Sequence, residues 1–369
     1  MSDGKTLRLG LIGCGAFGEF CLEAFSELEG VRAVAVADIV AAAADRLAER
    51  FGAPACYEPA ELIARDDVDI VHIATPPSTH CRLAAAAADA GKHVLCEKPL
   101  ATTMTDADAI MAAVGKAGTI APVNFVLRHN AVTDAVKAVI DSGALGRVLA
   151  GRLTNCAADS MLPPEHWFWK RDVSGGIFVE HDVHFFDLYA HWLGPGEVIA
   201  AHTETREGTD QQDRVMCTVR HAGGAVVSHY HAFDQVGPMD RTDHRLVCEL
   251  GDIRVDGWIP LSMTVDAAVS DEGVAKLQAV LPDCRVESDR PISAAGMISR
   301  GQQRTVTRRV RLTHEPAPDK QAVYADSVRA LLADQIAFIR DPSHVRRVVE
   351  QDGYDSLAMA ARAVELAEG

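Results

Sequence analysis

The chain lacks an excess of positive charge, and it lacks an apolar run long enough to cross a bilayer. Its 369 residues include 36 Lys and Arg against 52 Asp and Glu, so the formal net charge is -16 at pH 7. This balance disfavours binding to nucleic acid or to an anionic membrane surface. The longest apolar stretches contain charges or fall short of the roughly 20 residues that a membrane-spanning helix needs.

Paired cysteine motifs, internal repeats and low-complexity linkers are also missing. The nine cysteines are scattered, none of them in a CxxC pair, and their number is odd. Free and mostly buried thiols in a reducing cytosol are the simplest account of that distribution. Residues 1–6 are too short and polar for a secretory signal before the first predicted strand begins. We therefore expect a cytoplasmic enzyme, whose length suits two domains.

A glycine-rich turn follows the first predicted strand directly. Residues 7–12 form an apolar run, residues 13–18 read Gly-Cys-Gly-Ala-Phe-Gly, and a helical stretch covers 19–27. In a dinucleotide-binding domain the first glycine allows a tight turn, the second lets the backbone approach a pyrophosphate, and the third lets helix and strand pack closely. The helix N-terminus adds free N–H groups. The turn therefore predicts cofactor contacts from Gly13, Gly15, Ala16, Phe17 and Gly18.

An acidic residue completes this dinucleotide signature. A second apolar run over 31–37 ends in Asp38, twenty residues beyond Gly18. Asp38 should accept hydrogen bonds from the adenosine ribose hydroxyls and repel a 2′-phosphate, which favours NAD over NADP. Arg46, on the next predicted helix, is the residue that could reverse this preference. A structural turn without a ligand is the alternative interpretation of the glycines.

Strands and helices alternate through the first half of the chain. Such alternation predicts a parallel, doubly wound α/β sheet, whose ligands bind beyond the carboxyl ends of the strands. The expected strands are 69–74, 93–96 and 120–125, and the expected helices are 40–51, 80–90 and 105–117. The residues at or just after the strand ends are predicted to contact the cofactor, namely Ala74, Thr75, Pro76, His80, Glu97 and Lys98. The Lys98 ammonium could also meet a substrate hydroxyl, and an exposed surface lysine is the alternative.

The pattern changes after about residue 124. A helix over 133–142 precedes alternating runs at 148–156, 198–205, 214–221, 225–232, 245–250 and 306–312, and helices over 322–340 and 353–368 close the chain. Gly223-Gly224 and Gly251-Asp252 are expected to form hairpin turns. We therefore predict an NAD-binding Rossmann domain over 1–123 and an α+β domain over 124–369 with a large, mainly antiparallel open sheet. His229 and His231 share one strand face, where satisfied polar groups are favoured over a metal site.

Four ionisable residues recur along one apolar segment. Glu180, His184, Asp187 and His191 are spaced by four, three and four residues. On an α-helix they form one stripe, and because the other faces are apolar, the stripe should line a cavity or be paired within the protein. Desolvated carboxylate and imidazole groups held together suit proton transfer. A paired structural cluster is the alternative.

Several motifs point together to one known family. They are Gly13-Cys14-Gly15-Ala16-Phe17-Gly18, Ala74-Thr75-Pro76-Pro77 with His80, Glu97-Lys98-Pro99, Arg128, and Ser174-Gly175-Gly176 leading into residues 180–187. Over nearly its whole length the chain resembles the glucose–fructose oxidoreductase, inositol dehydrogenase and rhizopine-catabolism (Gfo/Idh/MocA) family. The resemblance implies NAD(P)-dependent oxidation or reduction of a sugar, cyclitol or related polyhydroxylated molecule. It also implies a homo-oligomer, a dimer or tetramer, assembled through the C-terminal sheet.

The resemblance also assigns roles to individual residues. Family roles carried over make Lys98 a contact to substrate and cofactor, His184 the acid/base and Arg128 a substrate contact. The family usually has aspartate where Glu180 stands and commonly glycine where Asp182 stands. The longer Glu180 arm should therefore shift the substrate by about one methylene, the length of one carbon–carbon bond.

The loop before this helix, 163–172, holds two of the four tryptophans. In the family a similarly placed loop covers the substrate. Aromatic rings that stack on a sugar face and charges that grip polar groups suit that task. We expect substrate contacts from Trp169, Lys170 and Arg171, whereas Trp167 could equally be a structural plug.

These observations predict an NAD-dependent dehydrogenase that interconverts an alcohol and a ketone, with Lys98, Glu180 and His184 as catalytic residues and no metal. His184 would take the hydroxyl proton, Asp187 or Glu180 would orient the imidazole, and Lys98 would polarise the oxygen. An unperturbed imidazole titrates near pKa ~6.5, which suits either direction. Three alternatives stay open: a metal enzyme using Glu180, His181, His184 and Asp187, a hydrolase that keeps NAD tightly bound for transient oxidation, and a non-catalytic NAD-binding regulator.

Overall fold

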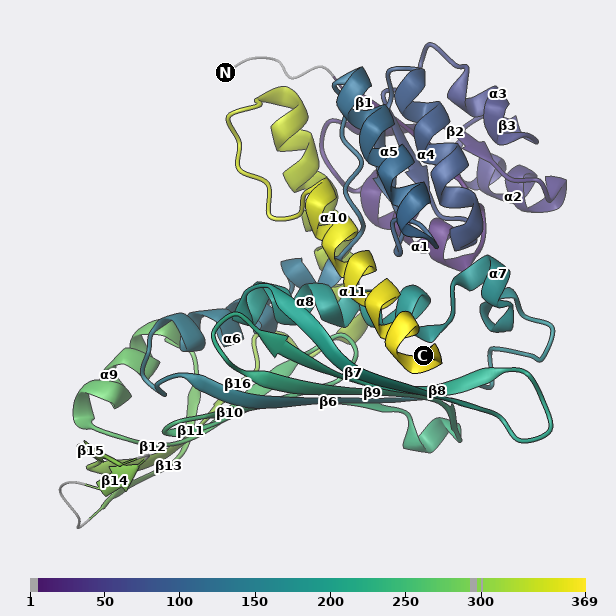
Figure 1. The fold of residues 1–369 in the computed structure, drawn as a ribbon. Helices are drawn as coiled ribbons and strands as arrows, with labels where there is room; N and C mark the ends of the chain where they lie inside the picture. The colour runs from purple at the N-terminus through teal and green to yellow at the C-terminus, as the bar shows by residue number, and fades with distance from the viewer. Residues whose placement is uncertain (1–5, 293–296, 300) are drawn as a thin grey trace. The chain divides into compact units, whose positions relative to one another are not determined.

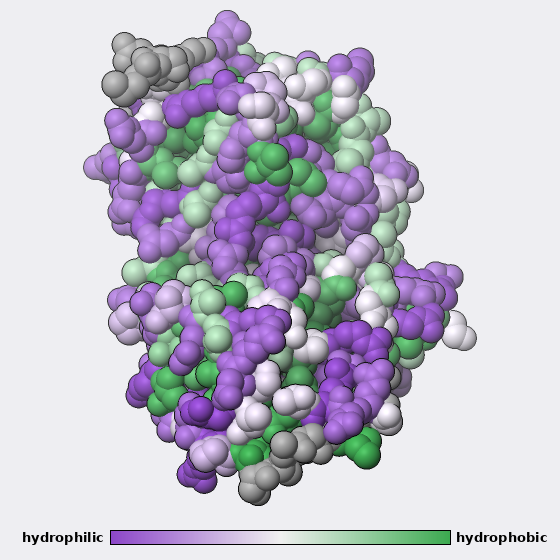
Figure 2. Space-filling view, turned by 90° about the vertical axis from the view of Figure 1, so that its left-hand side faces the viewer, coloured by the Kyte–Doolittle hydropathy of each residue, from purple (hydrophilic) through white to green (hydrophobic). Residues whose placement is uncertain are grey.

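The computed structural model describes residues 6–292, 297–299 and 301–369. The expectation about a secretory signal rests on residues 1–6, of which 1–5 lie outside the described residues. No helix within the described ranges is long and apolar enough to cross a membrane. On the face shown in Figure 2, hydrophilic residues predominate and hydrophobic ones are scattered among them. All nine cysteines are described and none forms a disulfide, and all but Cys81 and Cys284 are buried, as expected.

A parallel sheet of five described strands forms the N-terminal part of the fold, in the order β3-β2-β1-β4-β5 (Figure 1). Strand β4 is buried at every residue and β1 at all but one, as a sheet covered on both faces requires. The predicted doubly wound α/β sheet is confirmed. Its strands are β1 (Leu7–Ile12), β2 (Val31–Ala37), β3 (Ala55–Cys56), β4 (Ile70–Ile73) and β5 (His93–Cys96), and its helices are α1 (Ala16–Ser26), α2 (Ala41–Phe51), α3 (Pro59–Ile63), α4 (His80–Asp89) and α5 (Met104–Ala117).

The prediction of a strand over 120–125 is wrong. Val123 makes an isolated parallel bridge to Cys96, and the carbonyls of Ile120 and Pro122 accept hydrogen bonds from β5 at 2.8 and 3.0 Å. Proline has no N–H to donate, so a regular ladder cannot pass through residue 122. The segment still runs along β5, because the Asn124 N–H donates to the Cys96 carbonyl at 2.8 Å.

A mixed sheet of nine described strands forms the C-terminal part, in the order β13-β16-β12-β11-β10-β6-β9-β8-β7. Strands β6 and β9 pair in parallel, and the other neighbours pair antiparallel. Alternate residues of β8, β10 and β12 are buried, so one face of the sheet is covered. The predicted large, mainly antiparallel sheet is confirmed. Its strands are β6 (Val148–Ala158), β7 (Gly196–Thr205), β8 (Gln212–His221), β9 (Val226–Gln235), β10 (Arg241–Cys248), β11 (Gly251–Asp256), β12 (Ser262–Val269), β13 (Arg285–Pro291) and β16 (Arg308–His314).

The sequence prediction displaces one turn of this sheet and misses several elements. Gly251 opens β11 and pairs with Cys248, so the turn lies at residues 249–250 and not at Gly251-Asp252. The turn predicted at Gly223-Gly224 is confirmed, and Gly224 there has φ +85. Strand β13 is missed because it is polar and mostly exposed, so it lacks the alternation that marks a half-buried strand. Also missed are β3, α3, β11, β12, helix α9 (Asp271–Val280), and the paired strands β14 (Met297–Ser299) and β15 (Gln302–Arg304).

The described residues divide into two compact units, and neither is continuous in sequence. The first unit takes its residues from 1–128, 164–187 and 324–361, and the second from 129–163, 188–323 and 362–369. The predicted boundary between 123 and 124 stays a prediction. These units differ from it because they group 324–361, which holds most of the two C-terminal helices, with the N-terminal residues. The remaining helices are α6 (Ala131–Asp141), α7 (Arg171–Ser174), α8 (Val183–Leu193), α10 (Lys320–Arg340) and α11 (Glu350–Glu368).

The late segment joins the first unit through direct contacts. The carboxylate of Glu350 accepts a hydrogen bond from the Ala121 N–H at 2.9 Å. A Cβ built on Gly353 would lie 2.5 Å from a methyl group of Val123, so helix α11 approaches the 120–123 segment as closely as glycine permits. These contacts explain why residues more than 200 positions apart belong to one unit.

Buried histidines occupy the covered face of the second unit's sheet. His229, His231 and His244 are at most 2% exposed. Nδ1 of His244 lies 3.2 Å from the Tyr189 hydroxyl, and the Tyr189 ring packs against His229 with centroids 5.0 Å apart. Burial, together with His229 and His231 nearby, lowers the pKa of His244 to about 3.

This burial makes the second unit sensitive to acid. Because the pKa of His244 is depressed in the folded protein, its contribution to stability is fully present above the unfolded-state pKa of about 6.5. That contribution is lost as the pH falls from about 6.5 toward 3, because over this range only the unfolded chain takes up the proton. We expect His244→Asn, which keeps an acceptor for Tyr189, to flatten the dependence of the unfolding free energy on pH by up to about 1.4 kcal/mol per pH unit below 6.5. Urea denaturation between pH 7.5 and 4.5 measures this slope. His202→Asn, at an exposed histidine, is the control, and equal slopes in all three proteins would contradict the expectation.

Candidate active site

The glycine turn after β1 leaves room for a ligand at one position and packs against the chain at two others. Gly13 has φ +101, and a Cβ there would lie 2.2 Å from the Ala74 carbonyl oxygen. A Cβ on Gly18 would lie 2.1 Å from the Gly13 carbonyl oxygen. No described atom lies within 4 Å of a Cβ built on Gly15, which is exposed and caps α1. The first-turn N–H groups of α1, at Ala16 and Phe17, have no partner within the helix. The turn therefore fits a pyrophosphate beside Gly15.

Asp38 is held beside this turn. One carboxylate oxygen accepts the Cys14 N–H at 2.7 Å, and the other accepts the Val40 N–H at 2.8 Å. Arg46 donates to the Cys14 carbonyl at 3.2 Å and to Glu19 at 2.5 Å. Burial raises the pKa of the Cys14 thiol to about 12, with Asp38 adding to that rise, so the thiol stays protonated. An acidic and a basic side chain thus flank the same peptide, and the contact of Asp38 with the adenosine ribose remains a prediction.

The turn after β4 is braced by His80. The ring nitrogens of His80 lie 2.7 Å from the Pro99 carbonyl oxygen and 2.9 Å from that of Thr75. Burial lowers the pKa of His80, and the two carbonyl oxygens oppose that shift. The Thr75 hydroxyl lies 2.6 Å from that of Thr79, in the 3₁₀ turn η1 (Pro77–Thr79). His80 therefore fixes the backbone of Thr75 and Pro99, and its cofactor contact remains a prediction.

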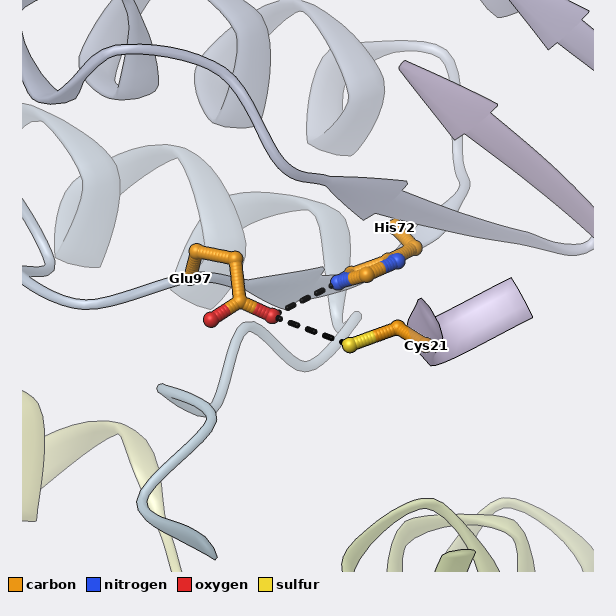
Figure 3. Close-up of side chains that lie close together, drawn as sticks. All are labelled: Cys21, His72 and Glu97. Carbon is orange, nitrogen blue, oxygen red and sulfur yellow. Dashed lines mark hydrogen bonds and ion pairs between the residues drawn. The ribbon is translucent and has the colours of Figure 1, made fainter. Parts of the chain in front are cut away.

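The side chain of Glu97 lies inside the first unit (Figure 3). One carboxylate oxygen lies 2.8 Å from Nε2 of His72 and accepts a hydrogen bond from the Asn124 amide at 2.7 Å. The Cys21 thiol points at the same oxygen from 3.9 Å. We call these four residues the Glu97 cluster. Its members come from α1, β4, the end of β5 and the 120–124 segment. The Glu97 N–H is also bonded within the unit, to the Ile73 carbonyl at 3.0 Å, so the cofactor contact of Glu97 remains a prediction.

Lys98 contacts Glu180 twice. Its ammonium donates to a carboxylate oxygen of Glu180 and, at 2.9 Å, to the Glu180 backbone carbonyl. Both side chains are largely buried, with 20% and 9% of their areas exposed. The peptide bond from Lys98 to Pro99 is cis. The alternative of an exposed surface lysine is therefore excluded.

The segment that carries Glu180 is not an ordinary α-helix. Residues Phe178–Asp182 form a π-helical turn, η4, and α8 begins at Val183. The prediction that residues 180–191 form one stripe on a single α-helix is therefore wrong for the first turn, which is π-helical. A π turn widens the spacing along the helix, and such turns are frequent at functional sites. The preceding Gly175 and Gly176 have φ of +82 and +85, a conformation the helix entry needs.

His184 and Asp187 lie beyond this turn and are buried. Burial and the nearby Lys98 ammonium lower the pKa of His184 well below its ordinary value, so its imidazole is neutral at pH 7. The ring meets Phe125 edge-on, with centroids 6.1 Å apart. Asp187 accepts two hydrogen bonds from Arg128, at 2.8 and 2.7 Å, and Arg128 also donates to Asp352 at 3.1 Å. Both carboxylates predicted to orient the imidazole thus contact cations, and that orienting role remains a prediction.

The aromatic loop takes up a short helical form. The 3₁₀ turn η3 (Trp167–Trp169) and helix α7 follow one another, and α7 packs against η1. Trp169 is half-buried and meets Phe168 edge-on, with centroids 5.0 Å apart. Lys170 and Arg171 are exposed. Their substrate contacts, like that of Trp169, remain predictions.

Several residues of the site have no signal in the sequence. Asp352 bonds to Arg128 across 224 positions, and Asn124 bonds to Glu97 across 27. His72 and Cys21 lie inside elements where they look like ordinary core residues. A buried polar residue within an apolar strand, such as His72, was the one available hint, since buried polar groups need partners.

The fold and site together define an oxidoreductase with a nucleotide-binding Rossmann domain. Residues 7–125 match the oxidoreductase family with an NAD-binding Rossmann fold, and residues 133–254 match the GFO/IDH/MocA C-terminal domain. The inositol 2-dehydrogenase 2 of Saccharopolyspora erythraea is 32% identical over 256 residues, which cover 67% of this chain and 73% of that protein. The chain belongs to the Gfo/Idh/MocA family.

The names of other relatives give different substrates. The dTDP-3,4-didehydro-2,6-dideoxy-alpha-D-glucose 3-reductase of Saccharopolyspora spinosa is 30% identical, over 62% of this chain and 71% of that protein. The 1,5-anhydro-D-fructose reductase of Ensifer adhaerens is 34% identical, over 47% of this chain and 53% of that protein. The chain thus matches about half the length of the latter.

Solved structures share the fold over nearly the whole chain. The WlbA dehydrogenase from Bordetella pertussis, in complex with NADH and UDP-GlcNAcA, superposes with a TM-score of 0.79 at 21% identity, covering 100% of this chain and 97% of that one. Levoglucosan dehydrogenase, in complex with NADH and levoglucosan, has a TM-score of 0.77 at 24% identity, covering 98% and 97%. These likenesses establish the fold.

Proposed function

We propose that this chain is an NAD-dependent dehydrogenase that transfers a hydride between nicotinamide and a secondary alcohol or ketone of a sugar, cyclitol or related polyol. The observation that supports it most is the group of Lys98, Glu180 and His184. A buried ammonium is bonded to a carboxylate, and one helical turn further along a buried imidazole is kept neutral. A neutral imidazole can accept a hydroxyl proton, and an ammonium can polarise the oxygen that loses it.

In the proposed reaction, different residues bind the cofactor, take the proton and stabilise the charge on the oxygen. Gly15 and the N–H groups of Ala16 and Phe17 would hold the pyrophosphate, and Asp38 would accept from the ribose hydroxyls. The bound nicotinamide supplies the hydride acceptor. His184 takes the hydroxyl proton on a ring nitrogen, while the Lys98 ammonium stabilises the negative charge that develops on the oxygen. Glu180 fixes the direction of that ammonium through two contacts.

The relatives support the substrate class. Their names include a nucleotide-linked didehydro-dideoxy sugar, an anhydro sugar and inositol, all sugar or cyclitol rings. A site built from a carboxylate, an imidazole and an ammonium can bond several hydroxyl groups of such a ring at once. Turnover with a panel of sugars and cyclitols, followed as NADH absorbance, tests the proposal. Hydrolysis without net NADH formation, or NAD binding without any turnover, would favour the hydrolase or the regulator.

We expect NAD to bind more tightly than NADP by roughly fivefold to a thousandfold. A 2′-phosphate about 4 Å from the Asp38 carboxylate would be repelled by about 1 kcal/mol in water and about 4 kcal/mol in a protein-like medium. Calorimetry with NAD and NADP measures the ratio, and Asp38→Ser should reduce it. Glu19→Gln should also reduce it, because Arg46 is then released from its acidic partner. Glu23→Gln is the control, since Glu23 pairs with Arg50 and not Arg46. Equal or tighter NADP binding by the unaltered protein would contradict the role given to Asp38.

We expect His184→Ala to lower turnover by roughly 10²–10⁴-fold while NAD affinity stays near that of the unaltered protein. For alcohol oxidation, the loss of kcat/KM on the acid side should occur below pH 6.5, because the lowered pKa keeps the His184 imidazole unprotonated down to that pH. His181→Ala, three residues earlier and half-exposed, is the control and also tests the metal alternative. Near-normal turnover by His184→Ala on a good substrate would remove His184 from the acid/base role.

We expect a homo-oligomer assembled through the outer face of the nine-stranded sheet. Ile199, Met216, Val226 and Val247 are 37–48% exposed on β7, β8, β9 and β10, on the face opposite the buried residues, and β6 lies between β9 and β10. Exposed apolar side chains grouped on one sheet face favour association. Light scattering at micromolar concentration should give a dimer or tetramer, and Met216→Asp with Val247→Asp should lower its mass. Met161→Asp, at an exposed loop methionine, is the control. A monomeric unaltered protein would contradict the assembly.

A further inference from the structure

The two buried cations of the site are both paired with carboxylates of the chain itself. Lys98 bonds to the carboxylate and the carbonyl of Glu180. Arg128 directs Nε and Nη2 at Asp187, Nη2 also at Asp352, and Nη1 at the Arg347 carbonyl at 3.4 Å. A guanidinium binds a substrate carboxylate through a pair of parallel N–H groups. The Nε–Nη2 edge, which would serve that purpose, is occupied by Asp187.

The charges of this group leave no positive surplus. Lys98 and Arg128 face three carboxylates, those of Glu180, Asp187 and Asp352, while His184 is neutral because burial and Lys98 depress its pKa. Burial raises the pKa of Asp187 to about 7 although Arg128 opposes the rise with bonds to both oxygens, so both protonation states of Asp187 must be counted. The balance is one negative charge with Asp187 ionised and zero with it protonated. In both states an entering anion meets no uncompensated cation.

The aromatic loop does not alter this balance. Its exposed cations, Lys170 and Arg171, are matched by the exposed carboxylates of Glu165 and Asp172. Surface charges of mixed sign contribute little net field, and salt screens them. The loop therefore offers side-chain contacts without a net attraction for anions.

We infer that the substrate is an uncharged polyol and not a sugar acid or a sugar phosphate. The inference rests on the proposed function and narrows its substrate class by charge. An anion that entered would lose its hydration, and the two cations that it met would already be neutralised by carboxylates of the chain. Glu180 and the neutral His184 can both accept hydrogen bonds, so they recognise hydroxyl donors. Uncharged cyclitols, aldoses and anhydro sugars supply those donors, and a uronate replaces one of them with a charge.

Paired ligands that differ in one carboxylate test the inference. The protein loaded with NADH is titrated by calorimetry with D-glucose, D-galactose and myo-inositol, and with D-glucuronate and D-galacturonate. We expect the best uncharged ligand to bind at least tenfold more tightly than the best uronate. Equal or tighter uronate binding, or no saturable binding of any uncharged member, would overturn the inference. Because binding is measured without turnover, failure of the proposed dehydrogenase activity is seen separately, as absence of NADH formation from NAD.

A charge-removing variant tests the cause of the selectivity. Asp352→Asn deletes one carboxylate on Arg128, and asparagine retains the oxygen that accepts the Val349 N–H at 2.7 Å, so the start of α11 is preserved. We expect uronate affinity to rise about threefold to tenfold relative to the uncharged partner. Asp355→Asn, an exposed position on the same helix bonded to Gln351, is the matched control and should leave the ratio unchanged. An unchanged ratio in Asp352→Asn, or an equal change in Asp355→Asn, would contradict the charge argument.

Discussion

A single buried carboxylate holds together the strand ends on which the site depends. Glu97 lies in the interior of the first unit, where one of its oxygens contacts His72 and Asn124 and faces the thiol of Cys21. A carboxylate taken out of water must be bonded, so each of these donors is required by the burial of the charge. The four residues belong to α1, β4, the end of β5 and the 120–124 segment. Those are the elements that present the glycine turn, Thr75, Lys98 and Phe125, so the positions of the functional groups follow from the Glu97 cluster.

The second constraint is the pairing of opposite charges away from water. Lys98 reaches Glu180 because the π-helical turn brings both the carboxylate and the carbonyl of that residue toward the ammonium. Arg128 joins the 3₁₀ turn after the 120–125 segment to α8 and α11 through Asp187 and Asp352. His184 lies among these pairs without a charge of its own. The pairs that satisfy the burial of each ion therefore also influence which protonation states the buried groups adopt.

The parts of the fold that the sequence predicts are those that depend on local pattern. The glycine turn, Asp38 and the alternating strands and helices follow from neighbouring residues, and the apolar alternation of β8 and β10 marks the second sheet. Pro122 prevents a strand that its apolar neighbours suggest. The polar strand β13 gives no signal, and the π turn cannot be read from a spacing that also fits an α-helix. Asp352 could not be predicted as a site residue, because its contact with Arg128 depends on the packing of segments 224 positions apart.

The close approach of Gly353 to Val123 has a consequence for the order in which the protein is made. The first unit draws on residues near 1–128, 164–187 and 324–361, and the contacts of Glu350 and Gly353 with the 120–123 segment belong to its interior. During synthesis the Rossmann strands emerge from the ribosome long before α11 exists, and contacts of high sequence separation form late. The apolar surface around Val123 thus stays uncovered until the last helix is translated. Chain termination shortly before residue 350 would leave a nucleotide-binding sheet with an open apolar flank, a species suited to recognition by chaperones and proteases.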